Sequence, residues 1–357
     1  MSTSTSTRAP VARRNTKLLP SLGILLVAGG ILLLLWFGWL WFNPGPAPYR
    51  YQLVTEGGID QFPQLGLPAG IDPALKLAQY EVYAEGVDQP LALTHTARLG
   101  TDAPVRLDWE NHTSELLVTV DNKLSELAAL SVAIAKHAPK DALILAWWDT
   151  SRQVNLLAGR DTLFTTRIGE PLIVPTPWLE RTDAIKRYEN EFWGAPAGEQ
   201  ERATFQRFAD ALLAPPETGA ALLRELAGNR EAYIAIHVND LYKLGLMRPK
   251  FDITYKNFPM EGNMHGLIGY LKTWMQSNQF DTYTLQSISD KMVRAYFLHK
   301  GPNSESLIAQ MLPFTESQPL ELQALQLIYQ QGGYWVYKIP APGDSASANS
   351  ADLSEGS

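Results

Sequence analysis

Hydrophobic and polar positions alternate with two different periods along residues 49–340, and together they predict a mixed α/β fold. Runs that are apolar throughout or alternate at every second position predict strands at 49–55, 91–99, 115–120, 142–147, 233–238, 292–299 and 334–339. Apolar residues spaced three and four apart predict helices at 121–136, 198–214, 217–227, 264–277, 304–312 and 320–330. Strands that alternate with helices favour a mixed, partly parallel sheet. We therefore expect an α/β domain at 121–340, preceded by a β-rich segment at 49–120.

Residues 18–42 contain no charged residue and predict a membrane-spanning helix. From Ser21 onward, this stretch spans roughly 33 Å as a helix, close to the ~30 Å thickness of a bilayer's hydrocarbon core. Trp36, Trp39 and Trp41 lie at its far end, where indole rings settle among headgroups. A cleavable signal peptide has a shorter apolar run and small residues at its cleavage site. We expect an uncleaved transmembrane anchor at 18–42, followed by a Pro-rich linker at 43–48.

The charges on either side of this anchor predict its orientation. Residues 1–17 form a basic stub with four positive side chains and no acidic one, whereas only Arg50 follows closely behind the anchor. The excess of positive charge places the stub in the cytoplasm and the rest of the chain in the periplasm. We therefore expect a single-pass protein of the inner (cytoplasmic) membrane. The tail at 341–357 is small, polar and acidic, which is typical of disorder.

Composition excludes several classes of function. The chain of 357 residues has no cysteine, so it cannot hold covalently attached c-type haem, a cysteine-ligated iron–sulfur cluster or a cysteine zinc site. Setting the four positive residues of the stub aside from the total of 30 leaves 26 Lys and Arg against 37 Asp and Glu, a net charge near −11. Such a charge disfavours nucleic acid and suits basic partners. The chain has no nucleotide-binding, hydrolase or HExxH motif, and its six histidines form no i, i+4 pair. We expect no cofactor and no metal, and binding rather than catalysis.

The segment from 146 to 162, AWWDTSRQVNLLAGRDT, contains the main candidate site. It follows the predicted strand at 142–147 and continues as a helix at 150–158, with Asp149 as the N-cap and Gly159 as the stop. A strand, a cap and a helix account for it without any function. The alternative is a contact surface, because ligands of open α/β sheets bind where the strands end at their carboxyl side. The candidate binding residues are Trp147, Trp148, Asp149, Arg152, Arg160 and, at the end of the strand at 233–238, His237.

The residues 145–149 (Leu-Ala-Trp-Trp-Asp) and 157–162 (Leu-Ala-Gly-Arg-Asp-Thr) are similar to the tryptophan-tryptophan-aspartate segment of oligosaccharyltransferase catalytic subunits. In that family the segment lies in an exported α/β domain and helps to recognise the acceptor sequon. The family continues with a tyrosine-glycine pair where this chain has Thr150 and Ser151, and its catalytic carboxylates belong to a many-helix membrane domain. The resemblance implies an alternative function, a periplasmic peptide- or glycan-binding domain without its catalytic membrane part.

The layout of the chain resembles a second family over a greater length. A basic stub, a single anchor, a periplasmic domain of about 300 residues, the Trp-Trp-Asp-Thr-Ser-Arg-Gln segment at 147–153 and the closing Gly-Gly-Tyr-Trp-Val-Tyr-Lys run at 332–338 are similar to the hydroxylamine oxidation protein HaoB. That family occurs in ammonia- and methane-oxidising bacteria beside the multihaem hydroxylamine oxidoreductase. The resemblance implies a membrane-tethered accessory or docking protein of hydroxylamine oxidation. Its partner would be that periplasmic oxidoreductase or a cytochrome.

Overall fold

The computed structural model describes residues 18–42, 45–67, 71–113, 117–118, 123–170, 172–260, 264–289 and 291–341. The predicted stub at 1–17, most of the tail at 341–357 and the first two residues of the linker at 43–48 lie outside the described residues. So do most of the strand predicted at 115–120 and the start of the helix predicted at 121–136. The statements below concern the described residues.

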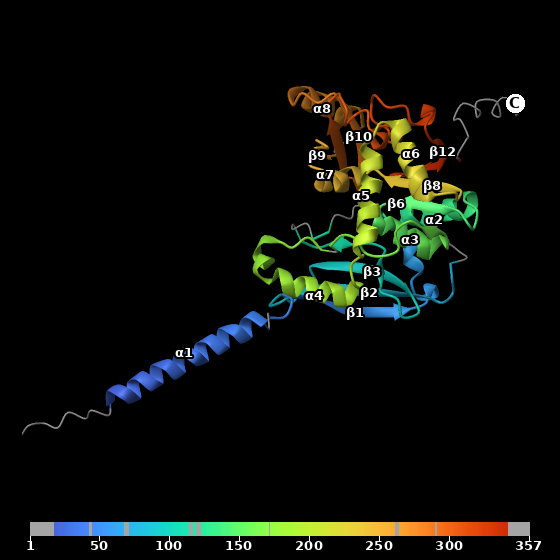
Figure 1. Ribbon diagram of the computed structural model, residues 1–357. Helices are drawn as coiled ribbons and strands as arrows, with labels where there is room; N and C mark the ends of the chain where they lie inside the picture. The colour runs from blue at the N-terminus through green and yellow to red at the C-terminus, as the bar shows by residue number, and fades with distance from the viewer. Residues whose placement is uncertain are drawn as a thin grey trace, which may run out of the picture.

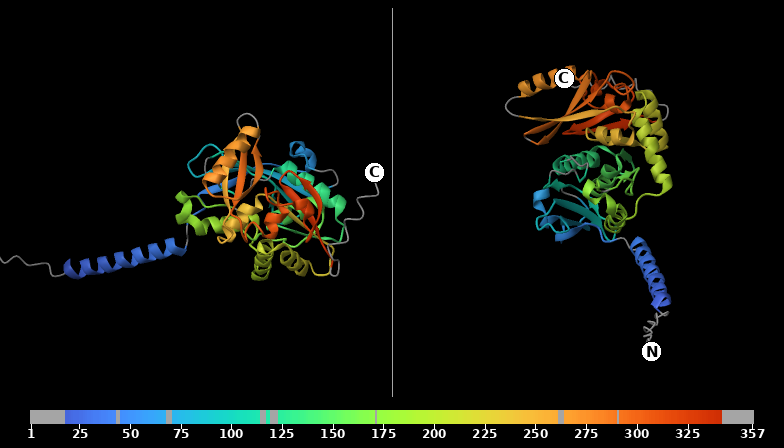
Figure 2. Two further views of the ribbon diagram at one scale, coloured as in Figure 1. Left: turned by 90° about the horizontal axis from the view of Figure 1, so that it is seen from above. Right: turned by 90° about the vertical axis from the view of Figure 1, so that its left-hand side faces the viewer.

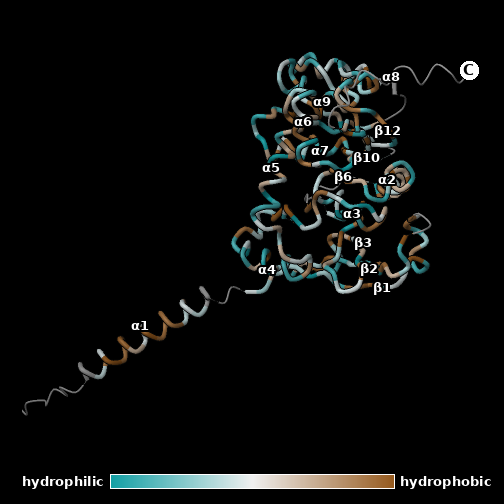
Figure 3. The backbone as a smooth tube through the Cα atoms, turned by 45° about the vertical axis from the view of Figure 1, so that its right-hand side comes forward, coloured by the Kyte–Doolittle hydropathy of each residue, from teal (hydrophilic) through white to brown (hydrophobic). Residues whose placement is uncertain are grey.

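Helix α1 (Leu18–Phe42) projects away from the rest of the chain as a single rod (Figures 1 and 2). Its stretch Ser21–Trp39 is long and apolar enough to cross a membrane, and none of its side chains is buried by the rest of the protein. Figure 3 shows it as a long hydrophobic segment outside the folded part. The apolar helix predicted at 18–42 is therefore present with the predicted bounds.

An antiparallel sheet follows α1 in the chain, in the order β1-β2-β3-β4, with β5 paired to β3. Its strands are β1 (Tyr49–Gly57), β2 (Leu75–Ala84), β3 (Ala92–Leu99), β4 (Val105–Arg106) and β5 (Glu110–Asn111). Two short 3₁₀ turns, η1 (Ile59–Gln61) and η2 (Pro63–Leu65), connect β1 to β2. Helix α4 (Thr182–Trp193), which the sequence analysis did not predict, packs Ile185 against Val82 of this sheet.

The central sheet is mixed, as predicted, and has the order β12-β13-β8-β6-β7. The strands are β6 (Leu143–Ala146), β7 (Asp161–Thr162), β8 (Ala232–His237), β12 (Gln326–Gln331) and β13 (Tyr334–Ile339). Strand β6 runs parallel to β7 and β8, whereas β13 is antiparallel to β8 and β12. All four residues of β6 and all six of β8 are buried, which is the usual state of parallel strands covered on both faces.

Strands β6, β8 and β13 of the central sheet each contribute to two cores, because successive side chains point to opposite faces. Leu143 and Leu145 join the core beneath α5 (Glu199–Leu213), α6 (Pro216–Ala227) and α9 (Leu307–Met311). Ile144 and Ala146 join the opposite core, which contains residues of α2 (Leu124–His137), α3 (Trp148–Ala158) and the first sheet. Figure 1 shows this layering, with α5 and α6 on one side of β6 and β8 and the first sheet on the other.

A third sheet has the order β10-β11-β9 and is antiparallel throughout. Its strands are β9 (Thr254–Pro259), β10 (Thr282–Ser289) and β11 (Met292–Leu298), and α8 (Met264–Ser277) packs on it through Leu267 and Leu271. The remaining elements are α7 (Asp240–Met247), η3 (Thr176–Arg181) and η4 (Pro319–Glu321).

The prediction of a helix at 320–330 is wrong. Residues 319–321 form the turn η4, and Gln326–Gln331 is strand β12, which pairs with β13 through the two-residue turn Gly332–Gly333. Cross-strand pairing in a hairpin outweighs the helical spacing of a few leucines in this segment. The helix predicted at 304–312 is confirmed only as the short α9.

Candidate functional site

The two tryptophans that follow strand β6 have different environments. Trp147 is 5% exposed and packs edge-to-face on Phe205, with the ring centroids 4.9 Å apart, so it belongs to the core. Trp148 is partly exposed and begins α3. The backbone at Gly169 lies against the indole of Trp148. A Cβ atom at Gly169 would lie 3.2 Å from this ring, which is closer than most side chains approach one another. Of the pair, Trp148 is therefore the one available for contact.

Asp149 is not the N-cap that the sequence predicts. The N-cap is Trp147, whose side chain makes no capping hydrogen bond, and Asp149 lies in the first turn, where Oδ1 accepts the N–H of Thr150 at 2.7 Å. The carboxylate instead pairs with Nζ of Lys243, 3.0 Å away on α7. The side chain of Lys243 is only 6% exposed, and a buried ammonium group requires a counter-charge. The predicted stop at Gly159 is confirmed, with a φ of 58°.

The charges of this pair stabilise each other. Burial opposes ionisation of Asp149, but the charge and hydrogen bonds of Lys243 and the N–H of Thr150 outweigh it and lower the pKa of the carboxyl. Burial also opposes the charge of Lys243, and the attraction of Asp149 and Asp240 outweighs it and raises the pKa of the ammonium. Nζ of Lys243 lies 3.2 Å from Asp240. Both partners of the pair are therefore charged at neutral pH.

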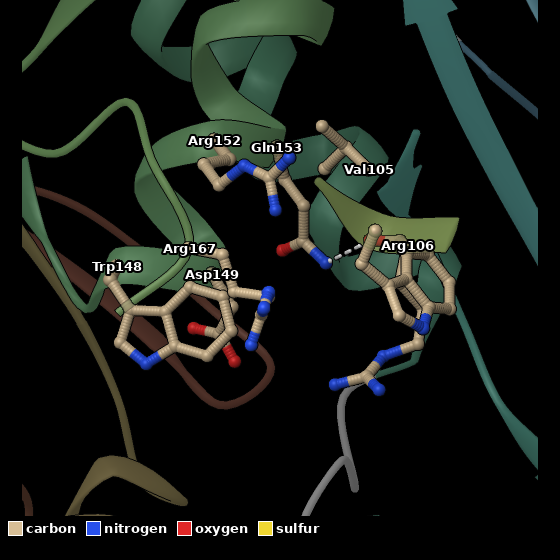
Figure 4. A pocket seen from close by; sticks show the side chains of 8 residues that line it. Val105, Arg106, Trp148, Asp149, Arg152, Gln153 and Arg167 are labelled. Carbon is tan, nitrogen blue, oxygen red and sulfur yellow. Dashed lines mark hydrogen bonds between the residues drawn. The ribbon is translucent and has the colours of Figure 1, made fainter. Parts of the chain in front are cut away.

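Asp149 also borders a pocket between α3, the first sheet and the end of α4 (Figure 4). We call it the arginine pocket, since three of its eight lining residues are arginines. The lining residues are Val105, Arg106, Trp148, Asp149, Arg152, Gln153, Arg167 and Trp193. It holds about 340 Å³ of space, part of which opens to solvent. Figure 4 shows Arg152 and Arg167 pointing into the same space, with Trp148 and Asp149 on one side and Arg106 on the other.

The three arginines come from three different parts of the chain. Arg106 lies on β4, and Nε2 of Gln153 donates to its carbonyl oxygen at 2.8 Å. Arg167 follows β7 and donates to the carbonyls of Gly169 and Gly194, both at 3.1 Å, and to Asn190. Arg152, on α3, donates to the carbonyl of Pro104 at 3.3 Å. The arrangement is a polar, positively charged pocket with two indole walls.

Burial and neighbouring charges shift the pKa values of the three arginines in the pocket. Burial, reinforced by the charges of Arg167 and Arg106, lowers the pKa of Arg152 to about 10. Burial likewise lowers the pKa of Arg106 and of Arg167. All three guanidinium groups remain protonated at neutral pH, because arginine loses its proton only at strongly basic pH. The pocket can therefore attract negatively charged oxygen atoms and orient them by hydrogen bonds.

Besides Trp147, two of the predicted binding residues lie outside the arginine pocket. Arg160 donates to the carbonyls of Ala135 and Ala138, and these hydrogen bonds satisfy carbonyl groups at the C-terminal end of α2. His237 is 1% exposed, lies 3.4 Å from Glu126 through Nε2, and accepts the N–H of Asn239 at Nδ1. The structure brings together Trp148, Asp149 and Arg152 in the arginine pocket and leaves Trp147, Arg160 and His237 outside its lining.

The sequence analysis missed the other residues of this site. Asp149, Arg152 and Gln153 are spaced i, i+3, i+4 and share one face of α3, which is a signal that the sequence does contain. Arg106 and Arg167 come from a two-residue strand and a loop, where no periodicity marks them. Within the described ranges, no group of three or more His, Cys, Asp or Glu is placed to hold a metal ion.

Comparisons with known proteins extend these observations. No curated protein sequence matches the chain significantly. Among solved structures, the chain is similar to the crystal structure of the C-terminal domain of PglB from C. jejuni, with 11% sequence identity and a TM-score of 0.35. The match covers 60% of this chain and 99% of that chain. At so low a TM-score the likeness supports no conclusion about function.

The sequence profile of one family matches almost the whole chain. The family is described as HaoA-associated protein HaoB, and the match runs from residue 15 to residue 339, from just before α1 to the end of β13. It includes the helix α1, all three sheets and the arginine pocket, so the resemblance to this family seen in the sequence is confirmed. The chain belongs to the family of HaoA-associated proteins HaoB, which links it to hydroxylamine oxidation.

Proposed function

We propose that this protein is a membrane-tethered periplasmic accessory protein that binds HaoA and keeps it at the inner membrane during hydroxylamine oxidation. The observation that carries the proposal is the family match, which includes α1 and the folded part together. The family's description names an association with HaoA. In this proposal the chain acts by binding, and the oxidation chemistry belongs to its partner.

The properties of α1 support the tether. Its side chains between Ser21 and Trp39 are not covered by the folded part, so in water they would expose a large apolar surface. A lipid bilayer removes that surface from water. The rings of Trp36 and Trp39, with centroids 6.0 Å apart, lie near the end that leads into the folded part. The positive charges before α1 favour a cytoplasmic N-terminus, which supports the proposal that the folded part lies in the periplasm.

The experiment follows HaoA between membrane and soluble fractions in three strains. One strain lacks this chain, one carries it without residues 1–42 behind a cleavable export signal, and one has residues 18–42 replaced by an unrelated single-span helix of equal length. We expect HaoA to leave the membrane fraction in the first two strains and to remain there in the third. The substituted helix is the matched control, because it keeps the tether and removes the native α1 sequence.

A second measurement separates tethering from general effects on HaoA. The tagged full chain, solubilised in detergent, is expected to capture HaoA from the strain that carries it. If HaoA fractionates identically in all strains and is not captured, the proposed association is wrong. If it is captured yet stays at the membrane without this chain, the binding is real but the tethering role is not.

The alternative of a peptide- or glycan-binding domain remains a prediction from residues 145–162. It predicts that a sequon peptide or a lipid-linked sugar binds the chain and that Asp149→Ala weakens the binding. The three guanidinium groups of the arginine pocket suit anions better than the neutral hydroxyl groups of a sugar ring or of a sequon peptide.

A further inference from the structure

The arginine pocket brings three guanidinium groups together in one small space. Arg152 makes one hydrogen bond, to a backbone carbonyl, and among the described residues it forms no ion pair. Arg167 and Arg106 repel its charge, and Asp149 and Glu201 attract it, each more weakly than either arginine repels it. A folded protein keeps like charges together at a cost in stability unless something of opposite charge relieves them. This arrangement suggests that the pocket is built for a ligand.

The acidic side chains around the pocket are already engaged. Asp149 is held by Lys243, and Glu170 is 58% exposed and 3.6 Å from Arg167. Glu189 accepts hydrogen bonds from the hydroxyls of two tyrosines behind the pocket, and burial raises its pKa. Glu201 accepts backbone N–H groups of the neighbouring loop. None of these carboxylates forms an ion pair or a hydrogen bond with Arg152, so among the described residues its guanidinium group keeps the single bond to Pro104.

Two buried polar atoms of the lining have no partner in the described structure. Arg167 is 2% exposed, and its Nε–H donates to no acceptor. Gln153 is 5% exposed, and although its Nε2 donates to the carbonyl of Arg106, its Oε1 accepts nothing. Leaving such groups unsatisfied is unfavourable, so each indicates a missing partner. Arg167 requires an acceptor, and Gln153 requires a donor such as a water molecule that accompanies the ligand.

We propose that the arginine pocket binds a small planar oxyanion, either an inorganic ion of the size of nitrate or a carboxylate group. Two of its oxygens would accept the parallel N–H groups of Arg152, the geometry in which guanidinium groups bind planar anions. The Nε–H of Arg167 supplies a further donor, and the indoles of Trp148 and Trp193 restrict access of water. This inference does not depend on the association with HaoA.

Calorimetric titration of the detergent-solubilised full chain tests the proposal, with sodium nitrate as the inorganic probe and sodium acetate as the carboxylate probe. Sodium chloride at equal ionic strength is the reference. We expect saturable binding of at least one oxyanion, weakened by about tenfold or more in Arg152→Gln. Arg207→Gln is the matched control, since this arginine is 58% exposed and pairs with Glu225. Binding of one probe alone shows whether the ligand is an inorganic oxyanion or a carboxylate. Binding of neither probe, or equal binding in all variants, overturns the proposal.

Thermal unfolding distinguishes an anion-binding role of Arg152 from a purely structural role. If the pocket is an empty anion site, Arg152→Gln relieves repulsion, so the variant without anion is at least as stable as the wild type. The oxyanion then raises the melting temperature of the wild type and of Arg207→Gln, but not that of Arg152→Gln. Arg152→Lys keeps the charge without the paired donors and should respond only weakly. If Arg152→Gln lowers the melting temperature equally with and without oxyanion, Arg152 serves only to hold Pro104.

Discussion

Lys243 and Asp149 show how one residue pair joins distant parts of the chain. Lys243 Nζ lies 3.0 Å from Asp149 and 5.8 Å from the ring centroid of Trp147. Because the partners are separated by 94 residues, neither could be assigned from the sequence, and Asp149 was predicted to cap α3 instead. The local pattern of polar and apolar residues predicts where α3 lies and that it ends at Gly159. It cannot show which distant cation a carboxylate meets.

This pair makes stability depend on pH. Because the pKa of Asp149 is lowered in the folded state, its ionisation stabilises the fold fully above the unfolded value near 3.9. That contribution is lost as the pH falls through the folded pKa. We expect Asp149→Asn to lower the free energy of unfolding by about 3 kcal/mol at pH 7, because it leaves Lys243 with less counter-charge. The difference from the wild type should shrink below about pH 4.

Urea unfolding of the two proteins from pH 7 down to pH 3 measures this difference. Asp161→Asn is the control, because Asp161 is 67% exposed in its pair with Arg230 and its loss should change stability by no more than about 1 kcal/mol. A gap between Asp149→Asn and the wild type that stays constant down to pH 3 would show that ionisation of Asp149 does not contribute.

At the scale of elements, the hydrophobic pattern predicts the strands that are apolar throughout and also the mixed strands β1 and β3, but it misses several other strands in which polar and apolar residues are mixed. Strands β6, β8 and β13 were predicted because their residues are almost all apolar. Strands β2, β9 and β10 carry polar residues and were missed, although β2 does alternate in part. For β12, the pair Gly332–Gly333 is a hairpin signal, and the cross-strand pairing with β13 outweighs the leucine spacing of 320–330.

The hairpin of β12 and β13 depends on a close approach at its turn. A Cβ atom at Gly333 would lie 2.1 Å from Nε2 of His237 on the neighbouring strand, and the N–H of Gly333 donates to Glu126 of α2 at 2.9 Å. Gly333→Ala must displace His237, a buried side chain with its own hydrogen bonds. We expect it to lower the free energy of unfolding by about 2 kcal/mol.

Chemical denaturation measures the effect of Gly333→Ala, with Gly58→Ala as the control. Gly58 has ordinary extended backbone with a φ of −78°, and nothing lies within 4 Å of a Cβ atom there. Its substitution should change stability by less than about 0.5 kcal/mol. If both substitutions have the same small effect, the turn can move away from His237 without loss.

At the scale of the whole molecule, the first sheet and the central sheet share one core. Phe62, Leu75 and Leu77 pack in the same cluster as Ile144 and Val154. The sequence left open whether 49–120 is a separate domain, since a hydrophobic pattern shows that a face is buried but not what covers it. The arginine pocket lies along this junction, with β4 on one side and α3 on the other. Its geometry therefore depends on both segments being folded.

Because of this shared core, we expect the first sheet and the central sheet to unfold together. Leu77→Ala removes a fully buried side chain of β2 and should cost about 2–5 kcal/mol. In calorimetry of the full chain it should shift the unfolding of both sheets, not of one alone. Val87→Ala, in the same segment but 44% exposed, should leave the transition almost unchanged. Two transitions in the wild type, only one of which moves in Leu77→Ala, would instead mean that the sheets fold independently and that the arginine pocket forms only when they dock.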